Sequence, residues 1–328
     1  MPANLTPQYL SAEKEFRQAT TTEEKIRCLE KMIALLPKHK GTDHLYGDLK
    51  RRLSKLKSRS TKKGGQRAPL YCIPKEGVAQ VVLLGVPNVG KSRLVAALTS
   101  ARVEVADYPF TTRHPVPGMM AFEDVKIQLI DMPPVTETYM EPWVPDMVRR
   151  ADASLLVVDL GNDTVLEEAQ AVLNRLERVK VALRAEVPTE TAPDDPFTYR
   201  PAMLVCNKLD LPDAVERLEI VREEFAGRLP VLALSAATGT GLDDFRRELF
   251  LFLRLTRIYT KVPGKDPDLD EPFVLPAGST VRAVAAAVHK ELAEKINGAR
   301  VWGKGVYPGQ YVKLDHVLSD RDIVELHE

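Results

Sequence analysis

A strand-loop-helix pattern around residue 85 constrains this chain more than any other feature of its sequence. The apolar run Val78–Leu84 leads into Gly85-x-x-x-x-Gly90-Lys91-Ser92, and an amphipathic stretch follows. Glycines at both ends of such a loop let backbone N–H groups wrap a phosphate, and the helix N-terminus adds a favourable field. The lysine reaches the β- and γ-phosphates, and the serine hydroxyl can coordinate Mg²⁺. The pattern predicts a nucleotide phosphate site at Pro87, Asn88, Val89, Gly90, Lys91, Ser92 and Arg93.

From Val78 to about Thr256, apolar runs alternate with amphipathic stretches. Continuous apolar runs suit a parallel sheet that is buried on both faces, and the alternation implies right-handed helical crossovers. The expected strands are Val78–Leu84, Val125–Ile130, Ala153–Asp159, Ala202–Cys206 and Pro230–Leu234. The expected helices are Lys91–Leu98, Thr164–Val181, Asp213–Ala226 and Leu242–Arg257. The stretch Arg184–Pro201 holds four prolines and reads as an exposed loop.

Two polar motifs follow expected strands downstream of the phosphate loop. In Asn207-Lys208-Leu209-Asp210, the Asp210 carboxylate can accept both N–H groups on the guanine edge, which adenine does not offer. Lys208 can lay its stem against the base. Ser235-Ala236-Ala237 ends the next strand and supplies a backbone N–H for the guanine carbonyl. Either motif alone is weak, because such clusters are also ordinary strand-to-helix turns. In this order they predict a guanine site.

A Mg²⁺ site is predicted beside the phosphates. Asp131 ends the run Val125–Ile130, where a carboxylate can hold Mg²⁺ through water. Upstream, Tyr108-Pro109-Phe110-Thr111-Thr112 offers threonine hydroxyls for the same ion. Read alone, Thr111 and Thr112 are as readily plain loop threonines. The ordered set around them favours the metal.

The regions on either side of this α/β segment have a different character. Before it, capping-box spacing at Thr21 and a helical stripe as far as Leu36, then a second stripe ending near Leu56, predict a helical hairpin. Lys50–Arg67 carries nine basic residues and no acidic one, which is either a solvated helix face or a contact for a phosphate backbone. After it, the short runs Ile258–Val262, Pro272–Leu275, Ala299–Trp302, Tyr311–Lys313 and Ile323–Leu326 surround one expected helix, Thr280–Ile296.

Composition narrows the class of protein. At 328 residues the chain suits two or three domains, and 44% hydrophobic with 28% charged residues is typical of a globular protein with a core. Three widely spaced cysteines indicate neither a disulfide framework nor a zinc site. The N-terminus lacks the pattern of a signal peptide, and no apolar run approaches the roughly 18 residues that span a membrane. These features predict a cytoplasmic protein.

The ordered motifs carry a family resemblance. GVPNVGKS, YPFTT, DMPP, NKLD and SAA together resemble the developmentally regulated GTP-binding proteins and the related Obg proteins. The end of the chain, from RIYTKVPGK to LDHVLSDRDIVEL, is similar to the TGS domain, a ubiquitin-like β-grasp module. The basic N-terminal hairpin also resembles that group. The expected organisation is a basic helical hairpin at 1–67, a GTPase domain at 68–256 and a TGS domain at 257–328.

The resemblance implies Mg²⁺-dependent GTP binding, slow GTP hydrolysis and work on ribosomes or RNA, through the hairpin and the TGS domain. By the match to YPFTT it makes Thr112 the metal-binding threonine, with Phe110 and Thr111 beside the nucleotide. The residues that would organise the reaction are Lys91, Thr112 and Asp131. An asparagine at the position of Asn88 helps relatives to hold K⁺ beside the phosphates.

Two departures from the family pattern stand out. The inserted domain expected near Arg184–Pro201 has no room here. The family's Asp-x-Pro-Gly reads Asp131-Met132-Pro133-Pro134, and proline lacks the N–H that normally contacts the γ-phosphate. Val135 occupies the place where Ras-like proteins keep a water-positioning glutamine. The sequence therefore predicts a slow GTPase, with two rivals: a nucleotide-dependent binding module without hydrolysis, and an ATP-using P-loop enzyme, against which Asn207–Asp210 argues.

Overall fold

The structure is a computed structural model. It describes residues 9, 12, 16, 22–36, 46, 49–53, 73–99, 114–188, 190, 192, 194–289 and 296–327. The chain divides into two compact units, Met1–Leu70 and Tyr71–Glu328.

The described residues of the first unit are helical, apart from a bend at Leu36. Helix α2, Thr22–Leu35, packs Leu29 and Met32 into a small core. Tyr9, Ala12 and Phe16 are also helical and join this core, so helical structure begins before the predicted start at Thr21. From the basic run, Lys50, Arg51 and Arg52 are helical and exposed, and residues 54–67 lie outside the described residues.

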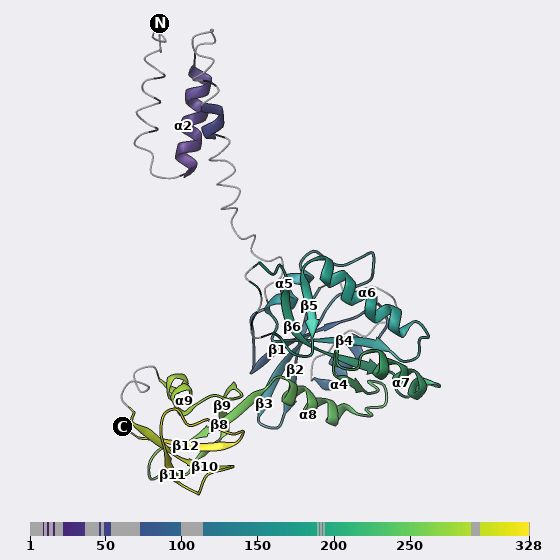
Figure 1. Cartoon of the computed structure of the whole chain (residues 1–328), viewed down its shortest axis with the longest axis vertical. Helices are drawn as coiled ribbons and strands as arrows, with labels where there is room; N and C mark the ends of the chain where they lie inside the picture. The colour runs from purple at the N-terminus through teal and green to yellow at the C-terminus, as the bar shows by residue number, and fades with distance from the viewer. Residues whose placement is uncertain are drawn as a thin grey trace. The chain divides into compact units, whose positions relative to one another are not determined.

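The second unit begins with a seven-stranded sheet (Figure 1). Its strands are β1 Ala79–Leu84, β2 Val116–Phe122, β3 Val125–Asp131, β4 Ala153–Asp159, β5 Val181–Arg184, β6 Thr198–Asn207 and β7 Val231–Ala233. The order is β2-β3-β1-β4-β6, and both β5 and β7 pair with β6. Only β2 runs antiparallel, and it pairs with β3. The mostly parallel sheet expected from the apolar runs is confirmed.

Helices cover both faces of this sheet. The helices are α4 Lys91–Leu98, α5 Val144–Arg150, α6 Val165–Arg178, α7 Ala214–Glu224 and α8 Leu242–Phe252. Alternate residues of the central strands separate two cores: Leu84 packs in the core with α5, α6 and α7, while Leu83 packs in the core with α4 and α8. Strands that are apolar on both sides therefore suit a three-layer arrangement.

A smaller sheet follows at the C-terminal end. It contains β8 Leu255–Thr260, β9 Asp268–Pro276, β10 Gly298–Trp302, β11 Gln310–Val312 and β12 Asp322–His327, in the order β11-β10-β12-β8-β9. Helix α9, Val281–Val288, packs Val281, Val284 and Ala285 against one face of this sheet. One helix against a mixed five-stranded sheet is the β-grasp arrangement predicted for this region.

Four expectations about single elements need correction. The helix predicted to run to Arg257 ends at Phe252, because Arg254 adopts a left-handed conformation (φ 49°) and β8 begins one residue later. The helix predicted over Thr280–Ile296 is interrupted after Val288, because His289 is extended, and residues 290–295 lie outside the described residues. The predicted loop Arg184–Pro201 is shorter, because Thr198–Pro201 pairs with β5 as the start of β6. The predictions also missed β2, β5 and α5.

Candidate functional site

The loop between β1 and α4 has backbone geometry that requires glycine. Gly85 and Gly90 have φ values of 151° and 91°, and Asn88 between them has 65°. A Cβ on Gly90 would lie 2.4 Å from Nδ2 of Asn207. Within the described residues, no side chain caps the N-terminus of α4, which begins directly after this loop.

Lys91 lies inside this loop. Its side chain is 7% exposed, and Nζ donates hydrogen bonds to the carbonyls of Gly85 and Val86, both at 3.0 Å. Burial lowers the Lys91 pKa from its ordinary value to about 8, and the nearby Asp131 carboxylate acts in the opposite direction. The amine is thus held by carbonyl groups at the place where a phosphate would offer stronger acceptors.

Ser92 and Asp131 come together at the predicted metal position. The Ser92 hydroxyl donates to Oδ2 of Asp131 at 2.5 Å, and Asp131 is fully buried at the end of β3. A hydroxyl and a carboxylate oxygen are ligands that suit Mg²⁺. Within the described part of the chain, no group of three or more His, Cys, Asp or Glu side chains could hold a metal by itself. Phe110, Thr111 and Thr112 lie outside the described residues.

Asn207 connects the phosphate loop to the predicted base-binding loop. Its Nδ2 donates to the Val89 carbonyl at 2.8 Å, and its Oδ1 accepts from the Ala236 N–H at 3.0 Å. Both hydrogen bonds are buried, and Asn207 is 2% exposed. The end of β6 therefore fixes the position of one loop relative to the other.

The remaining residues of the base-binding loops are also placed by hydrogen bonds. The Ser235 hydroxyl donates to Oδ1 of the exposed Asp210 at 2.5 Å and accepts the N–H groups of Ala237 and Thr238 at 3.2 and 3.1 Å. Lys208 adopts a left-handed conformation (φ 66°), and its Nζ lies 2.5 Å from Oδ2 of Asp159. The side chain of Asp210 is thus oriented by the neighbouring strand end.

The segment that follows Asp131 is packed against the sheet. Met132, Pro133, Pro134 and Val135 are all buried, and the Val135 side chain joins the core beside Trp143. The Val135 N–H donates to the Gly85 carbonyl at 3.1 Å. Because Pro134 has no N–H and that of Val135 is already bonded, neither residue presents a backbone donor to a phosphate in this conformation.

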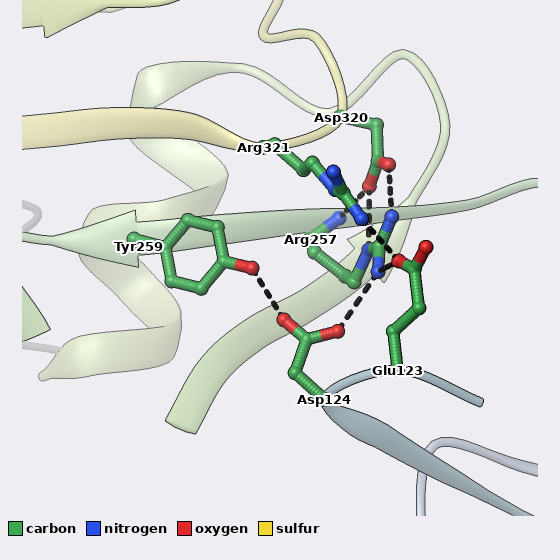
Figure 2. A network of polar contacts seen from close by, with 6 residues as sticks. All are labelled: Glu123, Asp124, Arg257, Tyr259, Asp320 and Arg321. Atoms are coloured by element: carbon green, nitrogen blue, oxygen red, sulfur yellow. Dashed lines mark hydrogen bonds and ion pairs between the residues drawn. The ribbon is translucent and has the colours of Figure 1, made fainter. Parts of the chain in front are cut away.

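Sequence reasoning missed a polar network that joins the two sheets of the second unit (Figure 2). Arg257 on β8 is 4% exposed. Its guanidinium donates to Asp320 at 2.6 Å and to Asp124 at 2.8 Å, and it also contacts Glu123. Glu123 and Asp124 form the turn between β2 and β3, while Asp320 precedes β12. No sequence signal pointed to it, because Arg257 was predicted as the last residue of a helix.

Charge and aromatic packing both hold Arg257 in place. Tyr259 donates to Asp124, Arg321 pairs with Glu123, and the guanidinium lies 4.7 Å from the Phe250 ring centroid. Hydrogen bonding from Arg257 lowers the pKa of Glu123. Burial opposes ionisation of Asp124 and Asp320, but hydrogen bonds, with Arg257 a donor to both, outweigh burial and lower their pKa values as well. Arg257 contacts all three carboxylates and, together with Arg321 at Glu123 and Tyr259 at Asp124, stabilises them in the charged form.

Both parts of the second unit resemble known protein families, and nearly the whole chain resembles known GTP-binding proteins. Residues 80–188 match the family described as 50S ribosome-binding GTPase, and residues 256–328 match the TGS domain. An uncharacterized GTP-binding protein of Methanocaldococcus jannaschii is 32% identical, with 93% of this chain and 92% of the relative covered. Ribosome-interacting GTPase 1 of Saccharomyces cerevisiae is 28% identical, with 94% and 99% covered. Developmentally-regulated GTP-binding protein 2 of Mus musculus is 26% identical, with 92% and 98% covered.

The phosphate loop, the linked base-binding loops and the β-grasp sheet together define a P-loop GTPase with a C-terminal TGS domain. Within that class, the chain belongs to the family of developmentally regulated GTP-binding proteins, which confirms the resemblance read from its motifs. It is a GTP-binding protein. No helix among the described residues has both the length and the apolar character needed to cross a membrane.

Proposed function

We propose that this GTP-binding protein binds GTP with Mg²⁺, hydrolyses it slowly, and acts in the cytoplasm on ribosomes or RNA. The observation that carries the nucleotide part is the double hydrogen bond of Asn207 to Val89 and Ala236, which holds phosphate and base loops in one frame. Because these hydrogen bonds hold the loops in position before the nucleotide binds, less conformational entropy is lost on binding.

On this proposal, each residue of the loops contacts a particular part of the nucleotide. Asp210 accepts the two N–H groups of the guanine edge, Lys208 covers the base, and the loop Ser235–Ala237 lies beside the guanine carbonyl. On this proposal the phosphates lie against Pro87–Arg93. Position 90 has no room for a side chain, because a Cβ there would lie 2.4 Å from Nδ2 of Asn207. Ser92, Thr112 and, through water, Asp131 would hold Mg²⁺, with Phe110 and Thr111 flanking them. Mg²⁺ neutralises charge on the phosphate oxygens when it is bound.

Catalysis on this proposal is by positioning and electrostatics, without a protein nucleophile. Lys91 moves its three donors from the loop carbonyls to the phosphates. Val135 lies with its side chain in the core and contributes nothing to orienting a water molecule. A second candidate, a nucleotide-dependent binding module with little hydrolysis, is favoured by Pro134, which has no N–H to contact the γ-phosphate.

The test of the nucleotide proposal is a comparison of ligands on one protein. Affinities for GTP, GDP and ATP are measured with Mg²⁺, followed by single-turnover hydrolysis of bound GTP. Tight GTP binding with slow turnover supports the GTPase, and binding without turnover supports the binding module. Equal affinity for ATP and GTP would contradict the assignment of the base-binding loops.

Pro134→Gly should improve discrimination between GTP and GDP. Glycine restores a backbone N–H next to the γ-phosphate position, and a hydrogen bond to a charged group contributes about 1.5–3 kcal/mol. We expect the GTP-to-GDP affinity ratio to rise about tenfold or more, with faster single-turnover hydrolysis. Nucleotide affinities and turnover rates of both proteins check this. Native hydrolysis at the rate of relatives that keep the glycine, with no gain in the variant, would show that the proline is already compensated.

Hydrolysis should be faster in K⁺ than in Na⁺. Asn88 is exposed on the phosphate loop, where its side-chain oxygen can ligate a monovalent cation beside the phosphates. Asn88→Ala should abolish the difference between the salts, while GTP affinity in Na⁺ stays as in the native protein. Turnover is measured in matched chloride solutions. Identical native rates in the two salts would rule out a potassium role.

The ribosome or RNA role rests on the exposed basic residues of the first unit and on the likeness to a relative named as ribosome-interacting. Cations aligned on one segment bind phosphate backbones by releasing counterions. Co-sedimentation with ribosomal particles in GTP- and GDP-loaded states is the direct test. Absence of the protein from the particle fractions in both states would contradict this role.

A further inference from the structure

The side chain of Lys208 spans the ends of two neighbouring strands. Lys208 follows directly after β6, and its Nζ lies 2.5 Å from Oδ2 of Asp159, the last residue of β4. Asp159 and Asn207 are register partners at the ends of these parallel strands. The lysine stem therefore runs from the end of β6 to the end of β4, and the Asp159 carboxylate fixes its charged end.

The Asp159 carboxylate is itself held in place. Its Oδ1 accepts the Gly161 N–H at 2.8 Å, so that Oδ2 is left for the ammonium group. The Leu160 N–H donates to the Asn207 carbonyl at 3.0 Å and attaches the chain after β4 to the end of β6. A Cβ on Gly161 would lie 2.5 Å from the Leu211 side chain, so this chain segment also packs against the base-binding loop. The position of Asp159 is thus set by the loop that it supports.

The strand order places this ion pair on the path of a bound nucleotide. In the sheet, β4 lies between β1 and β6, and β7 pairs with the other side of β6. The phosphate loop follows β1, and the base-binding loops follow β6 and β7. Ligands of such sheets lie outside the carboxyl ends of the strands, so a nucleotide that reaches both sets of loops must cross the end of β4. The Lys208 stem runs along the same edge, where its methylene groups can cover the face of a base.

The ion pair restricts the lysine more than it stabilises the fold. The side chains of Lys208 and Asp159 are 33% and 16% exposed, and ion pairs that water reaches contribute little to folding. The flexible stem of a lysine otherwise samples many rotamers. Immobilising such a side chain when a ligand binds reduces affinity. Pairing with Asp159 orders the stem of Lys208 in advance and so lowers that loss.

We propose that Asp159 is a positioning residue of the nucleotide site, which holds Lys208 against the face of the base and raises the affinity for guanine nucleotides without touching them. The proposal rests on the proposed guanine site and adds a residue to it. Asp210 is assigned to the edge of the base, so Asp159 affects how tightly a nucleotide binds and not which base is preferred. Because Lys208 acts at the base, GTP and GDP gain equally.

Asp159→Asn should weaken binding of GTP and of GDP by the same factor, about two- to tenfold, because Lys208 must then be ordered on binding. The amide keeps an oxygen for the Gly161 N–H, so the loop keeps its acceptor. The preference for GTP over ATP should stay as in the native protein. Affinities are measured on the full chain by titration with fluorescent nucleotides. The matched control is Asp163→Asn, which removes an ion pair with Arg217 at 2.6 Å from the same loop and should bind normally.

A second variant shows whether Asp159 acts through Lys208. Lys208→Met keeps the stem and loses the charge, so it should weaken binding at least as much as Asp159→Asn does. Adding Asp159→Asn to Lys208→Met should then cause no further loss, because residues that act as a pair are not additive. A further loss as large as in the native background would show that Asp159 acts independently of Lys208 and would overturn the proposal.

The nucleotides themselves provide two more outcomes. Tighter binding by Asp159→Asn, with a larger gain for GTP than for GDP, would mean that the carboxylate only repels phosphates, and the proposal would be wrong. A native protein that prefers GTP over ATP, together with native affinity in Asp159→Asn, would refute the positioning role alone. Equal native affinity for ATP and GTP would refute the guanine site and this inference with it.

Discussion

Asp210→Asn should lower GTP affinity by about a hundredfold or more and raise affinity for xanthosine triphosphate. The carboxylate accepts two N–H groups of guanine, and each hydrogen bond to a charged group contributes about 1.5–3 kcal/mol. An amide can accept one of them and presents a donor where guanine also presents one. Xanthine carries a carbonyl at that edge, so the amide donor finds a partner there.

The structure supplies a matched control for this exchange. Ser235 donates to Oδ1 of Asp210 at 2.5 Å and so orients the carboxylate without meeting the base. Ser235→Ala should weaken GTP binding by a smaller factor and should not change the preferred base. Affinities for GTP and xanthosine triphosphate are measured for the native protein and both variants. An Asp210→Asn protein that still prefers GTP would show that the guanine edge is read elsewhere.

Arg257→Met should destabilise the second unit strongly. It removes the cation that Glu123, Asp124 and Asp320 share, and it leaves Arg321, which pairs with Glu123, as the remaining cation of the network. Breaking a buried ion pair costs about 3–5 kcal/mol, and we expect about 2–4 because these carboxylates are partly exposed. The free energy of unfolding is measured by denaturant titration at neutral pH. Arg257→Lys, which keeps one charge but loses the planar fork, should fall between the two proteins.

The same network predicts how stability depends on pH. The pKa values of Glu123, Asp124 and Asp320 are lowered in the folded chain. Their contribution is therefore complete above the ordinary carboxyl values of about 4 and is lost as pH falls through the lowered values. The stability gap between native protein and Arg257→Met should be constant from about pH 5 to 7 and close towards pH 2. A gap that does not change with pH would mean that packing against Phe250, rather than charge, holds Arg257.

The phosphate loop was predictable because its requirements are local. Gly85, Gly90 and Lys91 follow an apolar run, and that order by itself dictates a loop whose backbone faces a phosphate. The buried parallel strands were predictable for a similar reason, since a strand covered on both faces must be apolar throughout. Strand β4 has the bounds predicted from its run, Ala153–Asp159.

Elements that depend on distant partners were not predictable in this way. Strand β2 contains Pro117 and Gly118 and reads as a loop, but it pairs with β3 along its whole length as the edge of the sheet, where a proline is tolerated. Helix α8 was predicted to continue through Leu255 to Arg257. Pairing with β9 places these residues in strand β8 instead.

The sequence by itself determined the class of nucleotide site, because the residue types and their spacing carry that chemistry. Only the tertiary structure decided that Asn207 ties the two loops together, that the Val135 N–H bonds to Gly85, and that Arg257 joins the TGS sheet to the β2–β3 turn. These contacts join residues from 29 positions apart, for Asn207 and Ala236, to 133, for Arg257 and Asp124. Side-chain pairing over such separations depends on how the sheets pack, and no local pattern encodes it.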